Sequence, residues 1–438
     1  MSVQRITIDD VPLNTFHARM AFYTGGGAFC DGYILGIISI ALAVLTPQLK
    51  LTSVKTGLVG SAALAGLFIG SLIFGYVTDI VGRKLMFILN LIVFVVGSVL
   101  QFFITDATQL IILRFIMGIA VGADYPIASS LMTEFTPKKY RGILIGSLVG
   151  MWWVGFVASY AIGAWMVSWG SGSWRWMLAS SALPAAILLI ARLDCPESPR
   201  WLMEKGRVEE ARKILDKYLG ENVDVEVPER QTKTSYLEIF RKQYRSRTIF
   251  CCLFWILSAA PGLAIATFIP KVLANFHLAQ GSAYVGSLII GIFYVVGLFP
   301  GLLLVDKIGR RPVLLWPFLG QAILLAALAG MADAKPWVIL VTFCLYAVLH
   351  SGQNPLQWIY PNELFPTEIR ATAVGFAAAM SRLGAFWGTF FMPLILNNFG
   401  NQAAMYFNAG LFFIGFVVTY FMAPETAHRT LAQTASVK

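Results

Sequence analysis

Four ionisable side chains lie deep inside apolar segments of this 438-residue sequence. At 1.5 Å of helix rise per residue, Asp31, Asp124, His350 and Arg382 lie roughly 15–20 Å from the nearest polar turn. Ionisable groups in apolar surroundings are costly unless they are paired or hydrated, and they mark functional sites by default. A carboxyl group there can exchange a proton near neutral pH, and an arginine can hold a carboxylate or phosphate through two hydrogen bonds.

The two carboxylates at matching depth are the predicted proton-coupling residues. Asp31 lies in the first apolar segment and Asp124 in the fourth. The alternative is a structural role, in which hydroxyl groups or Arg114 hold a buried carboxylate. The sequence favours proton coupling but leaves both readings open.

Arg382 is the strongest indication of what the protein binds. Its guanidinium suits an organic anion, although an ion pair with Asp31 or Asp124 is an equal alternative. Amides bind hydroxyl groups, and aromatic rings stack on sugar faces or aromatic solutes, although rings in such segments more often serve packing. The other predicted substrate-binding residues are of these types: His350, Gln353, Asn354, Gln357, Gln321, Trp153, Tyr294 and Tyr33.

The apolar segments that carry these residues set the fold class. The sequence is 57% hydrophobic and 13% charged, with a mean hydropathy of +0.70, whereas a soluble domain carries about 25% charged residues. A helix needs about 20 apolar residues to cross a bilayer. The sequence therefore predicts an all-α membrane protein with twelve transmembrane helices, near 20–46, 54–78, 85–105, 107–132, 142–166, 174–194, 248–273, 281–305, 312–332, 336–360, 371–396 and 402–423. The least distinct boundary is near Asp106.

The distribution of positive charge predicts the orientation. With the N-terminus in the cytoplasm, the cytoplasmic side holds 26 of the 33 lysines and arginines and the opposite side holds five. Cytoplasmic loops are enriched in these residues, so both termini are expected in the cytoplasm of a multi-pass plasma membrane protein, the inner membrane in a bacterium. The net charge of +10 does not indicate nucleic-acid binding, because no basic stripe is interleaved with aromatic residues.

One long polar segment divides the chain. Residues 195–247 are predicted to be a cytoplasmic linker between an N-terminal six-helix half, 1–194, and a C-terminal six-helix half, 248–438. Within the linker, residues 197–219 have the apolar spacing of an amphipathic helix.

Three short patterns recur between the halves at nearly constant offset. Asp79-x-x-Gly82-Arg83 matches Asp306-x-x-Gly309-Arg310 after 227 residues. The Glu-x-x-Pro-x-x-x-Arg pattern at 134–141 returns at 363–370, and Pro-Glu at 196–197 returns at 424–425. Each falls in the same loop of its half. The halves are therefore predicted to be parallel repeats, an arrangement that suits a carrier with a site at the midplane.

These motifs resemble those of the major facilitator superfamily. The segments that carry the resemblance are 75–84, 114–118, 134–142, 196–202 and 361–370, and it covers essentially the whole chain. The sequence is most similar to the sugar-porter and metabolite:proton symporter branch, and it also resembles organic-ion transporters. The resemblance implies two pseudo-symmetric six-helix bundles and transport by alternating access.

The resemblance also implies cytoplasmic gate networks formed by the loop motifs. One network is expected to contain Asp79, Arg83, Glu134, Arg141, Glu197 and Arg200. Its counterpart is expected to contain Asp306, Arg310, Glu363, Arg370 and Glu425. Such groups can pair with the opposite half, or they can be ordinary cytoplasmic charges with local partners. Gly75 and Gly82 are expected to allow close backbone approach, and Leu302 in place of the second such glycine predicts looser packing.

Two departures from the family pattern bear on the substrate. Ile34 stands where sugar porters and related symporters carry an aspartate, so a transported proton would depend on Asp31 or Asp124. The segment 254–267 has no amide where sugar porters carry paired glutamines, which weakens the case for hexoses. The preferred substrate is a small organic anion, such as a sugar acid or an aromatic acid. Sugars, polyols and organic cations remain alternatives.

Other functional classes fit the sequence less well. It shows no nucleophile–base pair, metal-ligand spacing or cofactor motif, so an enzyme is not expected and no metal or cofactor is predicted. A channel would more often show a filter loop or charged rings. A non-transporting membrane sensor would more often carry an added soluble domain, but it remains a second alternative. The expected partners are a small-molecule substrate, protons and the lipid bilayer, and the protein is expected to act as a monomer.

Overall fold

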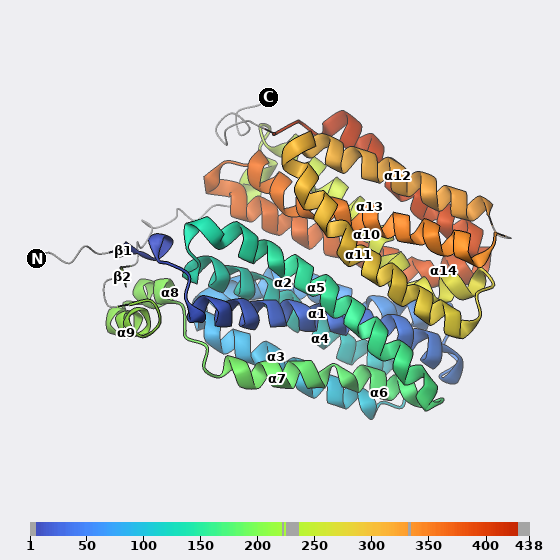
Figure 1. Cartoon of the computed structure of the whole chain (residues 1–438), viewed down its shortest axis with the longest axis horizontal. Helices are drawn as coiled ribbons and strands as arrows, with labels where there is room; N and C mark the ends of the chain where they lie inside the picture. The colour runs from blue at the N-terminus through green and yellow to red at the C-terminus, as the bar shows by residue number, and fades with distance from the viewer. Residues whose placement is uncertain (1–5, 221–222, 225–235, 332–333, 428–438) are drawn as a thin grey trace, which may run out of the picture.

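The computed structural model describes residues 6–220, 223–224, 236–331 and 334–427, which form a bundle of long helices (Figure 1). The N-terminal helices are α1 (Thr15–Gln48), α2 (Ser53–Val81), α3 (Arg83–Phe102), α4 (Ala107–Phe135), α5 (Lys138–Met166), α6 (Ser173–Ser180) and α7 (Ala182–Arg192). The later long helices are α10 (Arg245–Asn275), α11 (Gln280–Ile308), α12 (Arg310–Gly330), α13 (Pro336–Leu364) and α14 (Thr367–Met422). Short α8 (Pro199–Glu204) and α9 (Val208–Tyr218) lie between these two series.

The predicted membrane architecture is confirmed. Eleven helical stretches within the described residues are long and apolar enough to cross a membrane. One of them, α14, holds two predicted spans, because the chain breaks helical geometry at Gly400 with φ of 84°. The boundary near Asp106 is also confirmed: α3 ends at Phe102, and the Asp106 carboxylate accepts a hydrogen bond from the Thr108 N–H at 2.7 Å, which caps α4.

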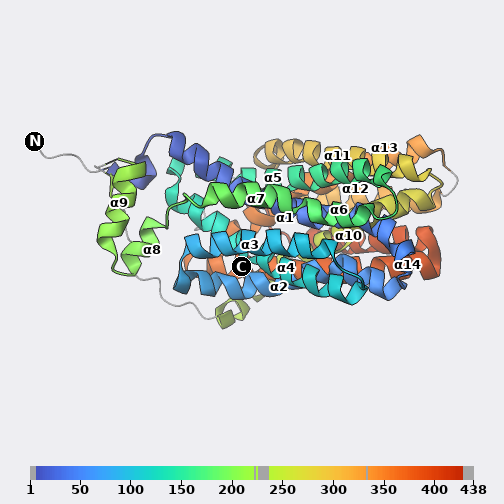
Figure 2. The same cartoon turned by 90° about the horizontal axis from the view of Figure 1, so that it is seen from below.

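The long helices form two groups that lie side by side. Helices α1–α7 pack mainly through the pairs α2–α4 and α1–α5, and helices α10–α14 pack through α10–α14 and α11–α13. Across the boundary, α2 contacts α14, α5 contacts α11 and α1 contacts α10 (Figure 1). We call the end of the bundle where α1 begins and where α8 and α9 lie the terminal end, and the opposite end the far end (Figure 2).

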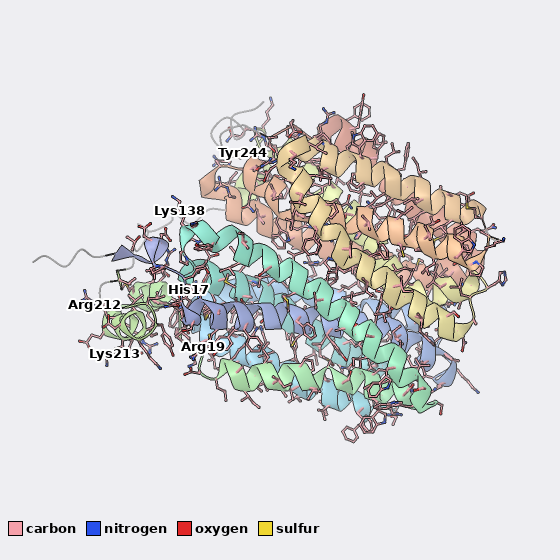
Figure 3. The ribbon with its side chains drawn as sticks, in the orientation of Figure 1. His17, Arg19, Lys138, Arg212, Lys213 and Tyr244 are labelled. Atoms are coloured by element: carbon pink, nitrogen blue, oxygen red, sulfur yellow. The ribbon has the colours of Figure 1, made fainter. Side chains whose placement is uncertain are left out.

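The outer surface of the bundle has the properties of a lipid-facing surface. Large apolar side chains along α7 and α11 are exposed, including Ile187, Ile190 and Leu303. At the far end, Trp165, Trp169 and Trp176 form a chain of ring contacts with centroids 4.9 and 6.3 Å apart. Tryptophans concentrate at membrane–water interfaces. Cationic side chains, among them Arg19, Lys138 and Arg212, lie at the terminal end (Figure 3).

The polar segment between the two groups is not one continuous helix as predicted for 197–219. Helix α8 ends at Glu204, and the chain turns at Gly206 with φ of 77° before α9 begins at Val208. A left-handed backbone at glycine lets the two helices fold against each other. Leu202 and Leu215 are buried as the pattern predicted, whereas Val208 is 45% exposed.

The N-terminal segment connects helices α8 and α9 to the bundle. Strand β1 (Ile6–Thr7) pairs in parallel with β2 (Val223–Asp224), and the turn η1 (Ile8–Asp10) follows β1. A further turn, η3 (Tyr236–Phe240), contacts α10 and α14. Asn14 caps α1 and its side-chain amide donates to the Tyr218 carbonyl at 2.9 Å. The segment therefore bridges α1 and α9.

Candidate functional site

A buried ion pair lies between α4 and the last turn of α7. The Arg192 Nη1 atom is 3.1 Å from Asp124 Oδ1, and the two side chains are 0% and 1% exposed. The guanidinium also donates to the carbonyls of Tyr23 and Phe87 at 2.7–3.1 Å, and its carbon lies 3.2 Å from the centroid of the Phe87 ring. In the structural alternative, a buried partner holds the Asp124 carboxylate. The structure supplies such a partner, and it is Arg192 rather than Arg114.

A glycine in α1 makes room for this pair. A methyl group at Gly27 would overlap Arg192 Nη2 and Asp124 Oδ2. Glycine is the residue that lets the guanidinium reach the backbone of α1 at Tyr23. The pair thus joins α1, α3, α4 and α7 at one point, because its members come from α4 and α7 and its other hydrogen bonds reach α1 and α3.

Asp31 lies close to the ion pair but is not part of it. Its side chain is 2% exposed, and Oδ1 has no hydrogen-bond partner among the described residues. The charged groups that act electrostatically on it are Asp124, Arg192 and Arg382. A buried carboxylic acid with a free oxygen can accept a proton at little structural cost, because no hydrogen bond to that oxygen has to be broken.

Arg382 reaches from α14 toward the N-terminal group of helices. Its guanidinium carbon lies 5.2 Å from the centroid of the Tyr125 ring, which follows Asp124 in α4. The side chain is partly exposed, and no carboxylate of a described residue lies within 4.0 Å of its nitrogens. The alternative of a direct ion pair with Asp31 or Asp124 is therefore wrong for this conformation, in which the aromatic ring of Tyr125 lies beside the guanidinium.

The predicted amides gather around one hydroxyl group in the C-terminal group. Both Gln353 Nε2 and Gln357 Nε2 donate to Ser258 Oγ of α10, at 2.9 and 3.2 Å. Gln353 is fully buried, its Oε1 has no partner among the described residues, and Gln357 is partly exposed. The buried side chain of Asn354 follows Gln353 in α13. Free amide atoms of this kind can bind solute hydroxyl groups.

His350 and Gln321 form a separate buried pair. The His350 Nδ1 atom is 2.9 Å from Gln321 Oε1, and both side chains are buried. The imidazole packs against Gly262 of α10, where an added methyl group would overlap the ring. The ring centroid of His350 also lies 5.8 Å from that of Tyr294 in an edge-to-face arrangement.

The predicted aromatic residues separate into two places. Trp153 of α5 stacks on Tyr294 of α11, with centroids 4.4 Å apart and an interplanar angle of 10°, so this pair connects the two groups of helices. Tyr33 instead directs its hydroxyl to Ser180 of α6 at 2.8 Å. The structure therefore brings Trp153 and Tyr294 together with the His350 pair, and it places Tyr33 within the N-terminal group.

The loop motifs of the N-terminal group form one connected network at the terminal end. Arg83 lies 3.0 Å from Asp79 and 3.6 Å from Glu134. Glu197 accepts hydrogen bonds from the backbone N–H groups of Arg83 and Lys84, at 3.0–3.2 Å, and so caps α3. The Ser198 hydroxyl donates to Glu134.

The C-terminal group repeats this network residue for residue. Arg310 lies 3.1 Å from Asp306 and 2.9 Å from Glu363. Glu425 accepts from the backbone N–H groups of Arg310 and Arg311 at 2.9 and 3.1 Å. Partial burial raises the pKa of the Glu425 carboxyl group, but hydrogen bonds from four backbone N–H groups outweigh it, so the pKa lies below its usual value.

The glycines before these caps explain the shared motif. Gly82 and Gly309 have φ of 109° and 105°, which side chains rarely adopt. A methyl group there would also come within 2.5 Å of Glu197 Oε2 or 2.7 Å of Glu425 Oε2. Each half thus uses a glutamate more than 110 residues away to cap the helix after its loop.

Three expectations about these loops need correction. Arg141 and Arg200 lie 2.5 and 3.9 Å from Asp9 of the N-terminal segment, and Arg370 donates to the Phe365 carbonyl at 3.2 Å. The contacts of the two networks therefore fall within each group of helices. A methyl group at Gly75 would meet nothing within 4 Å. The idea that Gly75 allows close approach is wrong, whereas the looser packing expected at Leu302, which is 52% exposed, stays a prediction.

Sequence reasoning missed several residues that complete these sites. Arg192 lies within the predicted span 174–194, and its charge inside an apolar run was the available signal. Tyr125, which follows Asp124 directly, holds the Arg382 side chain. Ser198 and Thr426 follow the repeated Pro-Glu motifs, and the Thr426 hydroxyl donates to Glu363 at 2.5 Å as Ser198 does to Glu134. The sequence carries a signal for these residues, because a hydroxyl side chain follows the Pro-Glu motif in both halves of the chain.

Comparisons with known proteins agree with this architecture. Residues 20–437 match the family model described as sugar (and other) transporter. The chain is 39% identical over 432 residues to the putative metabolite transport protein YaaU of Escherichia coli strain K12, covering 98% of this chain and 97% of the relative. It is 38% identical over 442 residues to the inner membrane metabolite transport protein YgcS of the same organism, covering 100% and 98%.

A solved structure has the same fold. The xylose transporter XylE from E. coli, in a partially occluded inward open conformation, superposes with a TM-score of 0.81 at 22% identity, over 95% of this chain and 100% of that one. The same protein is described elsewhere as a major facilitator superfamily proton:xylose symporter. With its membrane-spanning bundle and repeated loop networks, the chain belongs to the sugar (and other) transporter family, whose members are multi-pass membrane transporters and not enzymes.

Proposed function

We propose that this protein is a proton-coupled secondary transporter of a small hydroxylated carboxylate, such as a sugar acid. Transport proceeds by alternating access, in which an N-terminal half, 1–194, and a C-terminal half, 248–438, rock about the central residues while 195–247 link them. The terminal end faces the cytoplasm. The cations at that end, including Arg19, Lys138 and Arg212, support this orientation (Figure 3).

One observation carries the substrate proposal: the Arg382 guanidinium has no carboxylate partner among the described residues. An arginine near the middle of a bilayer needs an anion or water to offset its charge. The substrate carboxylate binds there, and Tyr125 fixes the guanidinium. The amides of Gln353, Asn354 and Gln357 bind the substrate hydroxyl groups.

The proton-coupling part of the proposal assigns different roles to the two aspartates. Asp124 is neutralised by Arg192 at 3.1 Å, whereas Asp31 retains a free, buried oxygen. Asp31 therefore binds the proton, and Asp124 with Arg192 sets the charge beside it. The positive charges of Arg192 and Arg382 balance the site when Asp31 is ionised.

A neutral sugar is the second candidate, and the geometry of the amides favours it. Gln353 and Gln357 converge on Ser258 in an arrangement suited to hydroxyl groups, and the structural neighbour is named a xylose transporter. In that case Arg382 acts on Asp31 rather than on the substrate.

Uptake into proteoliposomes tests the proposal. The purified protein is given gluconate, nicotinate, xylose or choline, with and without an inward proton gradient. We expect gluconate uptake that the gradient drives, and its loss in Arg382→Gln. Arg212→Gln on exposed α9 is the matched control and retains full uptake.

The variant Asp31→Asn separates coupling from transport. It is expected to abolish gradient-driven accumulation while leaving exchange of labelled for unlabelled substrate. If xylose were the only solute taken up, and Arg382→Gln left that uptake unchanged, the substrate would be a neutral sugar and not a carboxylate. No uptake of any of the four solutes would contradict both candidates.

A further inference from the structure

A cavity lies at the far end of the boundary between the two groups of helices. Its volume is about 190 Å³, which holds several water molecules or one small solute. Helices α1, α2, α10 and α11 line it. The polar lining residues are Ser39, Thr46, Thr56, Thr267, Lys271, Gln280 and Tyr284.

The cavity lies between the level of Asp31 in α1 and the far end. It follows α1 from Ser39 to Thr46 and α10 from Thr267 to Ala274, each about 10 Å at 1.5 Å per residue. These two helices are the first of their repeats and face each other. Ser39 is eight residues beyond Asp31 in α1, about 12 Å along the helix.

Hydrogen bonds across the boundary close the inner side of this cavity. Ser39 Oγ donates to the Ala266 carbonyl at 3.1 Å, and the Tyr160 hydroxyl donates to the same carbonyl. Tyr160 is 1% exposed and Ala266 1% exposed. Ser39 lines the cavity and Ala266 precedes the lining residue Thr267, so these hydrogen bonds join α1, α5 and α10 beside it.

The charge of the cavity selects its ligand. Lys271 is the only charged side chain among the described residues that line it. Its Nζ atom is held at 2.7 Å by the neutral Asn397 Oδ1, so its positive charge is not neutralised by that contact. The Asn397 amide nitrogen donates in turn to Ser53 Oγ of α2 at 2.7 Å, across the boundary between the groups.

We propose that this cavity is an outer binding site for a small carboxylate, with Lys271 as its anchor. The proposal rests on the proposed function, because it places the same class of solute one step before the central site. The carboxylate pairs with Lys271, and the threonine and serine hydroxyl groups bind the remaining polar atoms. Binding competes with Asn397 for the ammonium group and so loosens the Asn397–Ser53 bridge that holds the far end closed.

Uptake kinetics in intact cells test the anchor. For gluconate, Lys271→Gln is expected to raise KM about five-fold with kcat unchanged, the scale of one partly exposed ion pair. Lys271→Arg is expected to restore KM, and Lys335→Gln, a far-end lysine outside the cavity, is the control. An unchanged KM in Lys271→Gln, with wild-type uptake intact, would overturn this site while leaving the proposed function in place.

Thiol labelling tests occupancy without relying on transport. The five native cysteines are buried, so Thr46→Cys supplies a thiol in the cavity lining. A membrane-impermeant thiol reagent is expected to modify it on intact cells, and gluconate is expected to protect it, except when Lys271→Gln is also present. Labelling that gluconate and xylose slow equally would contradict the selectivity for carboxylates. Absence of gluconate uptake together with absence of protection would reject both proposals.

Discussion

At the scale of single residues, the buried Asp124–Arg192 pair distinguishes the two aspartates of the proposed central site, Asp31 and Asp124. Removing one member of a buried ion pair leaves the other charge buried without compensation. Replacing both members by neutral side chains leaves no uncompensated charge. Arg192 has a hydrogen-bond partner for each of its three nitrogens. It is therefore expected to contribute more to stability than the cations of the loops.

We predict that Arg192→Gln lowers the free energy of unfolding by about 3 kcal/mol, because Asp124 then lies buried without a counter-charge. The double variant Asp124→Asn/Arg192→Gln is expected to recover most of this loss. Thermal unfolding in detergent measures both, with Arg212→Gln as the control. A double variant as unstable as the sum of its single variants would show that the pair is not the coupled unit described here.

Two glycine substitutions, one beside this ion pair and one in open space, are predicted to have opposite effects on stability. Gly27→Ala is expected to destabilise the protein by about 2 kcal/mol or more, because the methyl group displaces Arg192 and Asp124. Gly146→Ala in α5 meets nothing within 4 Å and is expected to stabilise by about 0.5–1 kcal/mol through helix propensity. Melting temperatures compare the two. Equal effects would contradict the packing around Gly27.

At the scale of secondary-structure elements, distant glutamates cap helices that begin after a glycine. Glu197 caps α3 and Glu425 caps α12, and each carboxylate also lies beside the positive end of the helix dipole. The Asp-x-x-Gly-Arg loop and the Pro-Glu motif are therefore two parts of one structural unit. This accounts for their recurrence at nearly the same offset.

The cap at α12 predicts a pH dependence of stability. Because the pKa of Glu425 is below its usual value in the folded state, the ionised carboxylate stabilises the protein above the unfolded-state pKa. This contribution is lost as the pH falls through the folded-state pKa. The difference in melting temperature between the wild type and Glu425→Gln is therefore expected to be largest near pH 7 and to shrink toward pH 4. A difference that grows on acidification would reverse the assigned sign.

At the scale of the whole molecule, contacts at the far end set how readily the two groups of helices separate there. Ser39 and Tyr160 both donate to the Ala266 carbonyl. Each hydrogen bond contributes about 1 kcal/mol, so losing one shifts the equilibrium about five-fold toward an open far end. Elsewhere on the boundary, Gly57 of α2 packs against the Phe390 backbone of α14.

We predict that Tyr160→Phe increases the population with an open far end. Spin labels at Lys50 and Lys335, which lie in different groups of helices at the far end, report the separation as a distance distribution. The longer distance is expected to gain population in the variant. Tyr406→Phe, an exposed tyrosine in α14, is the control. An unchanged distribution would show that the hydroxyl of Tyr160 does not hold the far end closed.

The sequence by itself determined the features that depend on local composition. Runs of apolar residues gave the spans, the offset of about 228 residues gave the repeat, and the motif segments gave the family. Hydropathy and repetition act along the chain, so they are visible without knowing how helices pack. The polarity of Asp31, Asp124 and Arg382 inside apolar runs also marked the central site.

Only the tertiary structure decided which of these groups are paired. Arg192 lies 68 residues from Asp124, and Glu197 lies 114 residues from the Arg83 N–H that it caps. Such contacts depend on which helix faces pack together, and hydropathy does not encode rotation about a helix axis. For the same reason Gly75 and Gly82 look alike in the sequence, although one faces open space and the other faces a carboxylate. Among the described residues, this pairing leaves Asp31 Oδ1 without a hydrogen-bond partner and Arg382 without a carboxylate partner, which follows from packing rather than from residue type.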